Sequence, residues 1–211
     1  MAASTAAAPR LNPAYQRAAF LLGAAAPWQF PPDEGMEVAF AGRSNAGKSS
    51  VLNALSGRRA LARVSKTPGR TREINFFQID AGRRFADLPG YGFAQVPAAV
   101  KAAWGRLMES YFHQRRSLRG VVLVMDIRHP LTEFDQHMLA WSRERALAVH
   151  ILLTKADKLS RSRAQASLHQ IQAQLKKQDL PNTVQIFSAL KRTGVEDLHA
   201  RLDNWFGCQG A

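Results

Sequence analysis

The stretch Val38-Ala-Phe-Ala-Gly-Arg-Ser-Asn-Ala-Gly-Lys-Ser-Ser-Val-Leu52 decides the fold of this chain. An apolar run leads directly into Gly42-x-x-x-x-Gly47-Lys48-Ser49, and a helix-like pattern follows. A strand, a glycine-rich loop and a helix start in this order direct backbone N–H groups at the phosphates of a nucleotide. In such a loop the lysine reaches the β- and γ-phosphates, and the serine hydroxyl is a ligand of Mg²⁺. The stretch therefore predicts a nucleotide site.

Around this stretch, apolar strand-like runs alternate with helical patterns, which predicts an α/β fold with a mostly parallel sheet and helices on both faces. The turn signal Ala81-Gly82 predicts that the strands beside it are antiparallel neighbours. Residues 57–73 are basic, contain no acid before Glu73 and lack an apolar period, so we expect a loop there. The six expected strands are 36–41, 74–80, 83–87, 120–126, 149–154 and 183–188, and the expected helices are 48–56, 100–112, 131–141, 162–178 and 195–206.

The length of 211 residues suits one α/β domain with a full core. We expect residues 1–33 to be a flexible tail with a short helix around residues 13–22, residues 34–207 to be the nucleotide-binding domain, and residues 208–211 to be a C-terminal tail. Residues 1–32 contain arginine but no acid, so an organellar transit peptide is an alternative for this segment. We favour the tail, and with it a cytoplasmic protein.

Composition narrows the classes of protein and partner. The single cysteine, Cys208, cannot form an internal disulfide, which fits a reducing cytosol. No apolar run approaches the roughly 20 residues that span a bilayer. With 29 Lys and Arg against 16 Asp and Glu, the net charge of +13 predicts attraction to polyanions, with RNA or DNA ahead of a membrane surface. Besides the basic loop, the expected contributors to this surface charge are Arg83, Arg84, Arg115, Arg116 and Arg119.

A second motif, Asp87-Leu-Pro-Gly90, follows the third expected strand. A carboxylate at that strand end can hold Mg²⁺ through water, and the Gly90 N–H can sense the γ-phosphate. The basic loop before it must supply a second hydroxyl ligand for Mg²⁺. Thr71 is the candidate, and Thr67 competes with it in the same loop.

A third motif, Thr154-Lys155-Ala156-Asp157, ends the fifth expected strand. The Asp157 carboxylate can accept hydrogen bonds from N1–H and N2–H₂ of guanine, which adenine does not offer. The Lys155 stem can lie over the purine ring. Phe187-Ser-Ala189 ends the last strand, where a backbone N–H can meet guanine O6. The order of these motifs predicts a guanine-nucleotide switch.

Taken together, residues 42–49, Lys-Thr-Pro-Gly-Arg-Thr-Arg (66–72), Asp-Leu-Pro-Gly-Tyr-Gly (87–92), residues 154–157 and residues 187–189 closely resemble the EngB/YsxC family of bacterial GTPases. The resemblance covers roughly residues 15–206 and places the chain in the wider TrmE-Era-EngA-EngB-Septin-like superfamily. It implies a six-stranded Ras-like P-loop GTPase fold with one antiparallel strand. It also implies a role in assembling the large ribosomal subunit, and with it in the cell cycle, cell division and septation.

The resemblance further implies which residues contact GTP, with Mg²⁺ on Ser49 and Thr71 and, through water, on Asp87. Ala46 stands where a valine is common in the family, a change that leaves the loop geometry intact. The implied GTP contacts are Gly42, Arg43, Ser44, Asn45, Ala46, Gly47, Lys48, Ser49, Gly69, Arg70, Thr71, Arg72, Glu73, Asp87, Leu88, Pro89, Gly90, Thr154, Lys155, Ala156, Asp157, Phe187, Ser188 and Ala189.

The catalytic residues are less complete than the binding residues. Lys48 is the one catalytic group that we assign, and the position where Ras-type enzymes carry a water-positioning glutamine is Tyr91 here. We therefore expect slow intrinsic hydrolysis. Asn45 is the candidate for a K⁺ ion that stabilises developing charge, with a turn-favouring role as the alternative. Arg43 and Arg70 are conceivable arginine fingers, but we favour solvated loop residues.

Three classes of function remain open. The first is an assembly GTPase, expected to be a monomer, whose nucleotide state gates binding to ribosomal RNA and the large ribosomal subunit or its precursor. The second is a GTP-dependent binding module with negligible hydrolysis. The third is a small signalling GTPase at a membrane, which the C-terminal Cys-Gln-Gly-Ala does not favour because it lacks the aliphatic pair of a prenylation signal.

Overall fold

The computed structural model describes residues 12–58, 60–62, 73–90, 98–176 and 182–208. In these residues it contains seven strands, six α-helices and two short 3₁₀ segments. The strands are β1 (Ala19–Ala24), β2 (Met36–Gly42), β3 (Ile74–Asp80), β4 (Arg83–Asp87), β5 (Leu118–Asp126), β6 (Ala148–Thr154) and β7 (Asn182–Ile186). The helices are α1 (Pro13–Gln16), α2 (Lys48–Ser56), α3 (Ala98–Gln114), α4 (Glu133–Glu144), α5 (Arg161–Leu175) and α6 (Val195–Trp205), with η1 (Pro27–Gln29) and η2 (Ala156–Lys158).

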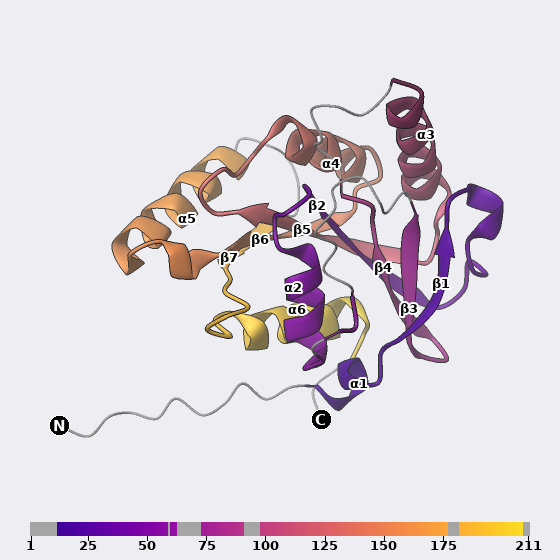
Figure 1. Cartoon of the computed structure of the whole chain (residues 1–211), viewed down its shortest axis with the longest axis horizontal. Coiled ribbons are helices and arrows are strands. Elements are labelled where there is room, and N and C mark those ends of the chain that lie inside the picture. Colours follow the sequence, from indigo (N-terminus) through magenta and orange to yellow (C-terminus); the bar gives the residue numbers. More distant parts are fainter. Residues whose placement is uncertain (1–11, 59, 63–72, 91–97, 177–181, 209–211) are drawn as a thin grey trace.

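The described strands form one sheet in the order β1-β3-β4-β2-β5-β6-β7 (Figure 1). Strand β3 pairs antiparallel with both β1 and β4, and the remaining pairs are parallel. Strand β3 is therefore the one strand that runs against the others in the described sheet. The predicted fold class is confirmed, and the sheet has one more strand than the six expected.

The additional strand, β1, replaces most of the helix expected around residues 13–22. Helix α1 ends at Gln16, and Ala19–Ala24 then pairs with β3, with an irregularity between Phe20 and Leu22. Strand β3 would otherwise leave a row of unpaired backbone groups at the edge of the sheet. Pairing with a distant strand therefore outweighs the local helical pattern.

Helix α1 attaches the segment before β1 to the domain. Tyr15 is fully buried, and its hydroxyl donates to the Asp203 carboxylate of α6 at 2.5 Å. The backbone N–H of Asn12 donates to Nδ1 of His199 at 2.9 Å. The described part of the expected tail is thus packed on the sheet, while the division of the chain at residues 33 and 207 stays a prediction.

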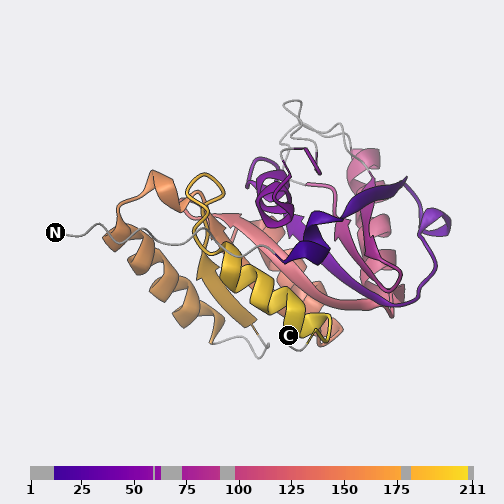
Figure 2. The same ribbon diagram turned by 90° about the horizontal axis from the view of Figure 1, so that it is seen from below.

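The sheet is covered on both faces. Helices α3, α4 and α5 pack on one core, and α1, α2 and α6 pack on the other, where they lie in front of the strands in the view from below (Figure 2). Alternate residues of β2 face the two cores, Ala39 and Ala41 toward the first and Val38 and Phe40 toward the second. The carboxyl ends of β2, β4, β5, β6 and β7 meet at one edge, where ligands of such folds bind.

Most element boundaries are close to those expected. Helix α2 spans the expected residues, and β3 and β4 pair across Ala81-Gly82 as predicted. Strand β7 ends at Ile186, two residues before the expected end, because the Ser188 N–H turns to bond the carbonyl of Thr193 at 3.1 Å. Helix α5 ends at Leu175 rather than near residue 178.

Two arginines expected at the charged surface are buried instead. Arg84 and Arg115 surround the carboxylate of Glu37, which has no exposed surface. Arg115 Nη2 lies 2.8 Å and Arg84 Nε lies 3.4 Å from Glu37 Oε2. The Tyr111 hydroxyl donates to Glu37 Oε1 at 2.6 Å. The expectation that these two charges face a polyanion is wrong. A buried Glu37 carboxylate without a counter-charge would cost more free energy than the arginines lose by leaving water.

A buried histidine makes the stability of the fold depend on pH. His150 of β6 lies between Thr183 Oγ1, at 2.7 Å from Nδ1, and Gln185 Oε1, at 2.8 Å from Nε2. Burial lowers the pKa of His150 to about 4, and the charge of Arg201 adds to this effect.

We predict that stability falls as the pH drops from about 6.5 to about 4. Between these pH values His150 is protonated in the unfolded chain but neutral in the folded protein. Protonation therefore favours the unfolded chain, and the full stability is present only above about pH 6.5. The loss should approach about 3 kcal/mol. Urea unfolding at several pH values should show a flatter profile for His150→Gln than for the wild type. The exposed-residue control His169→Gln should keep the wild-type profile, and a profile unchanged in His150→Gln would contradict the prediction.

Candidate nucleotide-binding site

The loop from Gly42 to Ser49 joins the end of β2 to the start of α2, as the sequence predicts. Two residues in the left-handed region shape it, Asn45 at φ 62° and Gly47 at φ 101°. Gly47 precedes the helix, and its carbonyl accepts the first helical hydrogen bond, from the Val51 N–H at 2.9 Å. The first backbone N–H groups of α2 therefore open toward the loop, which is the arrangement that binds phosphate oxygens.

The carboxylate predicted to act at the metal lies beside this loop. Asp87 is the last residue of β4, and its Oδ1 forms an ion pair with Nζ of Lys48. Both side chains are about nine-tenths buried, with 11% of Lys48 and 10% of Asp87 exposed. The turn after Asp87 approaches the loop so closely that a Cβ on Gly90 would lie 3.3 Å from the backbone of Ser44. The two predicted phosphate-side motifs are thus brought together.

The residues around Lys48 suit a magnesium ion. Ser49 offers a hydroxyl in the first turn of α2, and Asp87 offers a carboxylate at the neighbouring strand end. Hydroxyl and carboxylate oxygens are ligands that Mg²⁺ accepts. The described residues contain no cluster of three or more His, Cys, Asp or Glu that could hold a metal. The other expected ligand, Thr71, and its competitor Thr67 lie outside the described residues, as do Gly69, Arg70, Arg72 and Tyr91.

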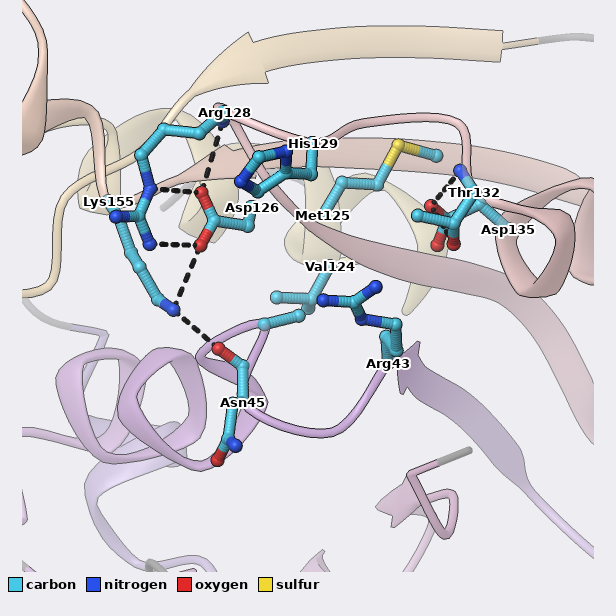
Figure 3. Close-up of a pocket in the computed structure, with 11 residues that line it drawn as sticks. Arg43, Asn45, Val124, Met125, Asp126, Arg128, His129, Thr132, Asp135 and Lys155 are labelled. Atoms are coloured by element: carbon cyan, nitrogen blue, oxygen red, sulfur yellow. Dashed lines mark hydrogen bonds and ion pairs between the residues drawn. The ribbon is translucent and has the colours of Figure 1, made fainter. Parts of the chain in front are cut away.

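Two residues of the Thr-Lys-Ala-Asp motif are tied to the phosphate loop. The buried Thr154 hydroxyl lies 2.5 Å from the Ala46 carbonyl oxygen and 2.9 Å from that of Met125. Lys155 has a left-handed φ of 57°, and its Nζ donates to the Asn45 carbonyl at 2.5 Å (Figure 3). These bonds fix the loop relative to the end of β6, so Thr154 supports the predicted site through the backbone.

The predicted base-reading residue lies at the other end of the site. The Ser188 hydroxyl donates to Asp157 Oδ1 at 2.7 Å and accepts from the Lys191 N–H at 3.2 Å. The Phe187 carbonyl accepts from the Ala156 N–H at 3.2 Å, which joins the two predicted base-side motifs. The hydrogen bond from Ser188 lowers the pKa of Asp157. The carboxylate therefore stays ionised at neutral pH, which suits a group that must accept two N–H donors.

Sequence reasoning missed Asp126, the last residue of β5. Its Oδ2 lies 2.9 Å from Lys155 Nζ, and the Arg128 guanidinium binds the same carboxylate at 2.9 and 2.6 Å (Figure 3). Burial works to raise its pKa, but these two cations hold it well below the usual range. Asp126 thus positions Lys155. Its place at a strand end, next to the strand that precedes the phosphate loop, is the signal that could have identified it.

A small pocket lies between the phosphate loop and the start of α4 (Figure 3). Asp135 lies there almost fully buried, and its Oδ2 accepts from the N–H and hydroxyl of Thr132, both at 2.8 Å. Its Oδ1 has no hydrogen-bond partner in the described residues. The lining residues are Arg43, Asn45, Ala46, Val124, Met125, Asp126, Arg128, His129, Thr132, Asp135 and Lys155.

The doubly wound sheet, the phosphate loop after β2 and the further motifs at the ends of β4, β6 and β7 define a P-loop GTPase domain. Residues 37–155 match the family model described as "50S ribosome-binding GTPase". The chain belongs to the EngB family of GTP-binding proteins. It is 52% identical over 200 residues to "Probable GTP-binding protein EngB" of Nitrosococcus oceani, covering 95% of this chain and 100% of that protein. It is also 52% identical over 191 residues to the protein of that name from Xylella fastidiosa, covering 90% and 94%.

Solved structures agree with this fold. A crystal structure of "a probable GTP-binding protein engB" superposes with a TM-score of 0.65 at 22% identity, covering 82% of this chain and all of that one. The bacterial selenocysteine-specific elongation factor EF-Sec superposes with a TM-score of 0.60 at 20% identity, covering 84% of this chain and 29% of that one. At these identities the likeness shows the fold alone.

We predict that Lys48→Ala weakens GTP binding by roughly 10- to 100-fold, the loss expected when a charged donor is removed from a bound anion. Isothermal titration calorimetry with GTP and Mg²⁺ measures the effect. Ser49→Ala should lose affinity mainly through a lower dependence on Mg²⁺. The surface substitution Lys176→Ala is the matched control and should bind as the wild type does. Unchanged affinity in Lys48→Ala would rule out the proposed phosphate site.

Proposed function

We propose that this protein is a slow GTPase required for assembly of the large ribosomal subunit, and that its nucleotide state gates binding to ribosomal RNA or the precursor particle. The observation that carries the proposal is the placement of both halves of the site at one sheet edge. Lys48 and Asp87 lie at the phosphate end, and Asp157 and Ser188 lie at the base end. The family description "50S ribosome-binding GTPase" and the net charge of +13 support the choice of partner.

In this proposal the residues of the chain have separate tasks. The loop N–H groups and Lys48 bind the phosphates, Lys155 lies along the base, and Asp157 reads its N1–H and N2–H₂. Ser49 and Thr71 would hold Mg²⁺ directly and Asp87 would hold it through water, and the ion would supply positive charge that offsets the negative charge of the phosphates. The remaining expected GTP contacts between Gly42 and Ala189 keep their predicted roles.

Slow turnover follows from the residue after the Asp-x-x-Gly motif. Tyr91 has no amide to hold the attacking water, and a phenol is a poor general base at neutral pH. We therefore propose that completion of the site comes from the ribosomal particle. Adding purified large subunits should raise single-turnover GTP hydrolysis, whereas adding small subunits should not.

We predict that K⁺ raises the single-turnover hydrolysis rate over Na⁺ at equal ionic strength, with Asn45 helping to hold the ion beside the phosphates. Asn45 lies in the left-handed region, so Asn45→Gly keeps the backbone while removing the side-chain oxygen. The K⁺ effect should disappear in this variant. The same K⁺ effect in Asn45→Gly would leave Asn45 with a turn-forming role alone.

Two other functions make different predictions. A binding module with negligible hydrolysis should show no turnover with or without particles. A signalling GTPase at a membrane should sediment with membranes rather than ribosomes; in the described residues no helix is long and apolar enough to cross a bilayer. Fractionation of cell extracts on a sucrose gradient tests the proposal, which expects a cytoplasmic monomer that comigrates with large-subunit particles. Comigration with membranes would contradict it.

A further inference from the structure

Cations from separate loops gather around the base end of the site. Lys158 follows Asp157 directly, and its Nζ lies 3.9 Å from the Asp157 carboxylate. Lys191 follows β7, and its backbone N–H bonds the same Ser188 that holds Asp157. After the hydrogen bond from Ser188, the charges of Lys158 and Lys191 both contribute to the low pKa of Asp157. The two lysines therefore flank one carboxylate from different elements of the chain.

Helix α5 extends this positive surface. Arg161 begins the helix three residues after Lys158, and both are exposed. From residue 158 to residue 176 the chain contains no Asp or Glu. By contrast, α4 and α6 carry acids in their first turns. Solvated surfaces usually intersperse both signs of charge. In α5 no acidic residue offsets the positive charge. We call Lys158, Arg161 and Lys191 the basic rim.

The carboxylates near the rim are already engaged. Asp126 binds Lys155 and Arg128, and Asp157 accepts from Ser188 and is assigned to guanine in the proposed function. Asp157 lies 3.9 Å from Lys158 and offsets part of the rim charge, but among the described residues the three rim cations outnumber this one carboxylate, so the rim keeps a net positive charge. A partner that matches them must be a polyanion with closely spaced charges, which an RNA backbone supplies.

We propose that the basic rim binds the phosphate backbone of RNA in the large ribosomal particle. This inference rests on the proposed function and adds a contact surface to it. The rim lies at the base end of the site, on η2, α5 and the segment after β7, whereas the γ-phosphate end is marked by Lys48, Asp87 and Gly90. The rim should therefore add affinity that is the same in the GTP and GDP forms.

The test uses the triple variant Lys158→Gln, Arg161→Gln, Lys191→Gln of the full chain. Binding to purified large ribosomal subunits is measured by pelleting at several salt concentrations, with GDP and with a non-hydrolysable GTP analogue. We expect the affinity to fall on the order of 10- to 100-fold, by the same factor with both nucleotides. The slope of log affinity against log salt should decrease by roughly 2 to 3.

The matched control is Arg17→Gln, Arg106→Gln, Arg143→Gln, which removes the same charge from exposed residues just after α1, in α3 and in α4. This control should lose much less affinity. Equal losses of affinity in both triple variants would contradict the proposal that the rim binds RNA. A rim variant that binds large subunits as the wild type does would contradict it as well. A rim variant that loses nucleotide affinity instead would assign these cations to the nucleotide and also overturn it. A wild-type protein that binds no large subunits would overturn the proposed function itself.

Discussion

Asp157→Asn is expected to weaken GTP and GDP binding by about 1,000-fold and to shift preference toward xanthine nucleotides. The carboxylate accepts from two N–H donors of guanine, and an amide in its place presents donors of its own to them. With xanthine, the amide can donate to the O2 that replaces the amino group. The hydrogen bond from Ser188 to Asp157 Oδ1 positions the carboxylate and favours its ionised form. The substitution therefore changes only the charge and the hydrogen-bonding chemistry of this side chain.

Competition of fluorescent GDP with GTP, ATP and XTP measures this switch. Asp197→Asn is the matched control, because it makes the same chemical change at an exposed carboxylate in the first turn of α6. It should keep the wild-type order, with GTP far tighter than ATP. Equal affinity of the wild-type protein for ATP and GTP would refute the assignment of Asp157.

Glu37→Ala is expected to lower the free energy of unfolding by about 3–5 kcal/mol, because it leaves the buried Arg84 without the Glu37 carboxylate and leaves Arg115 with the more distant Asp33, 3.8 Å away. Arg115 also donates to the Pro31 carbonyl at 2.7 Å, and Arg84 donates to the Pro32 carbonyl at 2.8 Å. The same cluster thus holds the segment before β2 against the amino ends of the strands. Its loss should loosen this segment as well as the core beside Tyr111.

Urea unfolding without nucleotide measures the change. Glu144→Ala is the control, since Glu144 is 55% exposed and lies 3.6 Å from His113 in a surface pair. That pair should contribute less than about 1 kcal/mol. A loss in Glu37→Ala no larger than in Glu144→Ala would show that the buried cluster is not what stabilises this edge.

The parts of the fold predicted correctly depend on residues close together in the chain. The phosphate loop, the helix that begins at Lys48 and the hairpin at Ala81-Gly82 each follow from a few adjacent residues. Strand β1 was missed because its partner, β3, lies about fifty residues further along the chain. A local pattern cannot show an edge that forms only after the sheet is assembled.

The candidate site shows the same division. Motifs whose functional residues are close together in the sequence, such as Asp87 with Gly90 and Asp157 with Lys155, were found from the sequence. The structure brings them to one edge of the sheet. The positioning role of Asp126 depends on pairing between strands. The burial of Arg115 depends on Glu37, 78 residues away, so a count of arginines overstated the surface charge.

In the proposed function, the nucleotide state controls binding to the large ribosomal subunit. The most direct measurement is pelleting of the wild-type protein with purified large and small subunits in the presence of GTP, GDP or a non-hydrolysable GTP analogue. We expect the protein to sediment with large subunits, more with GTP or the analogue than with GDP, and we expect binding to weaken steeply as salt rises. Binding that is equal with all three nucleotides, or that prefers the small subunit, would contradict it.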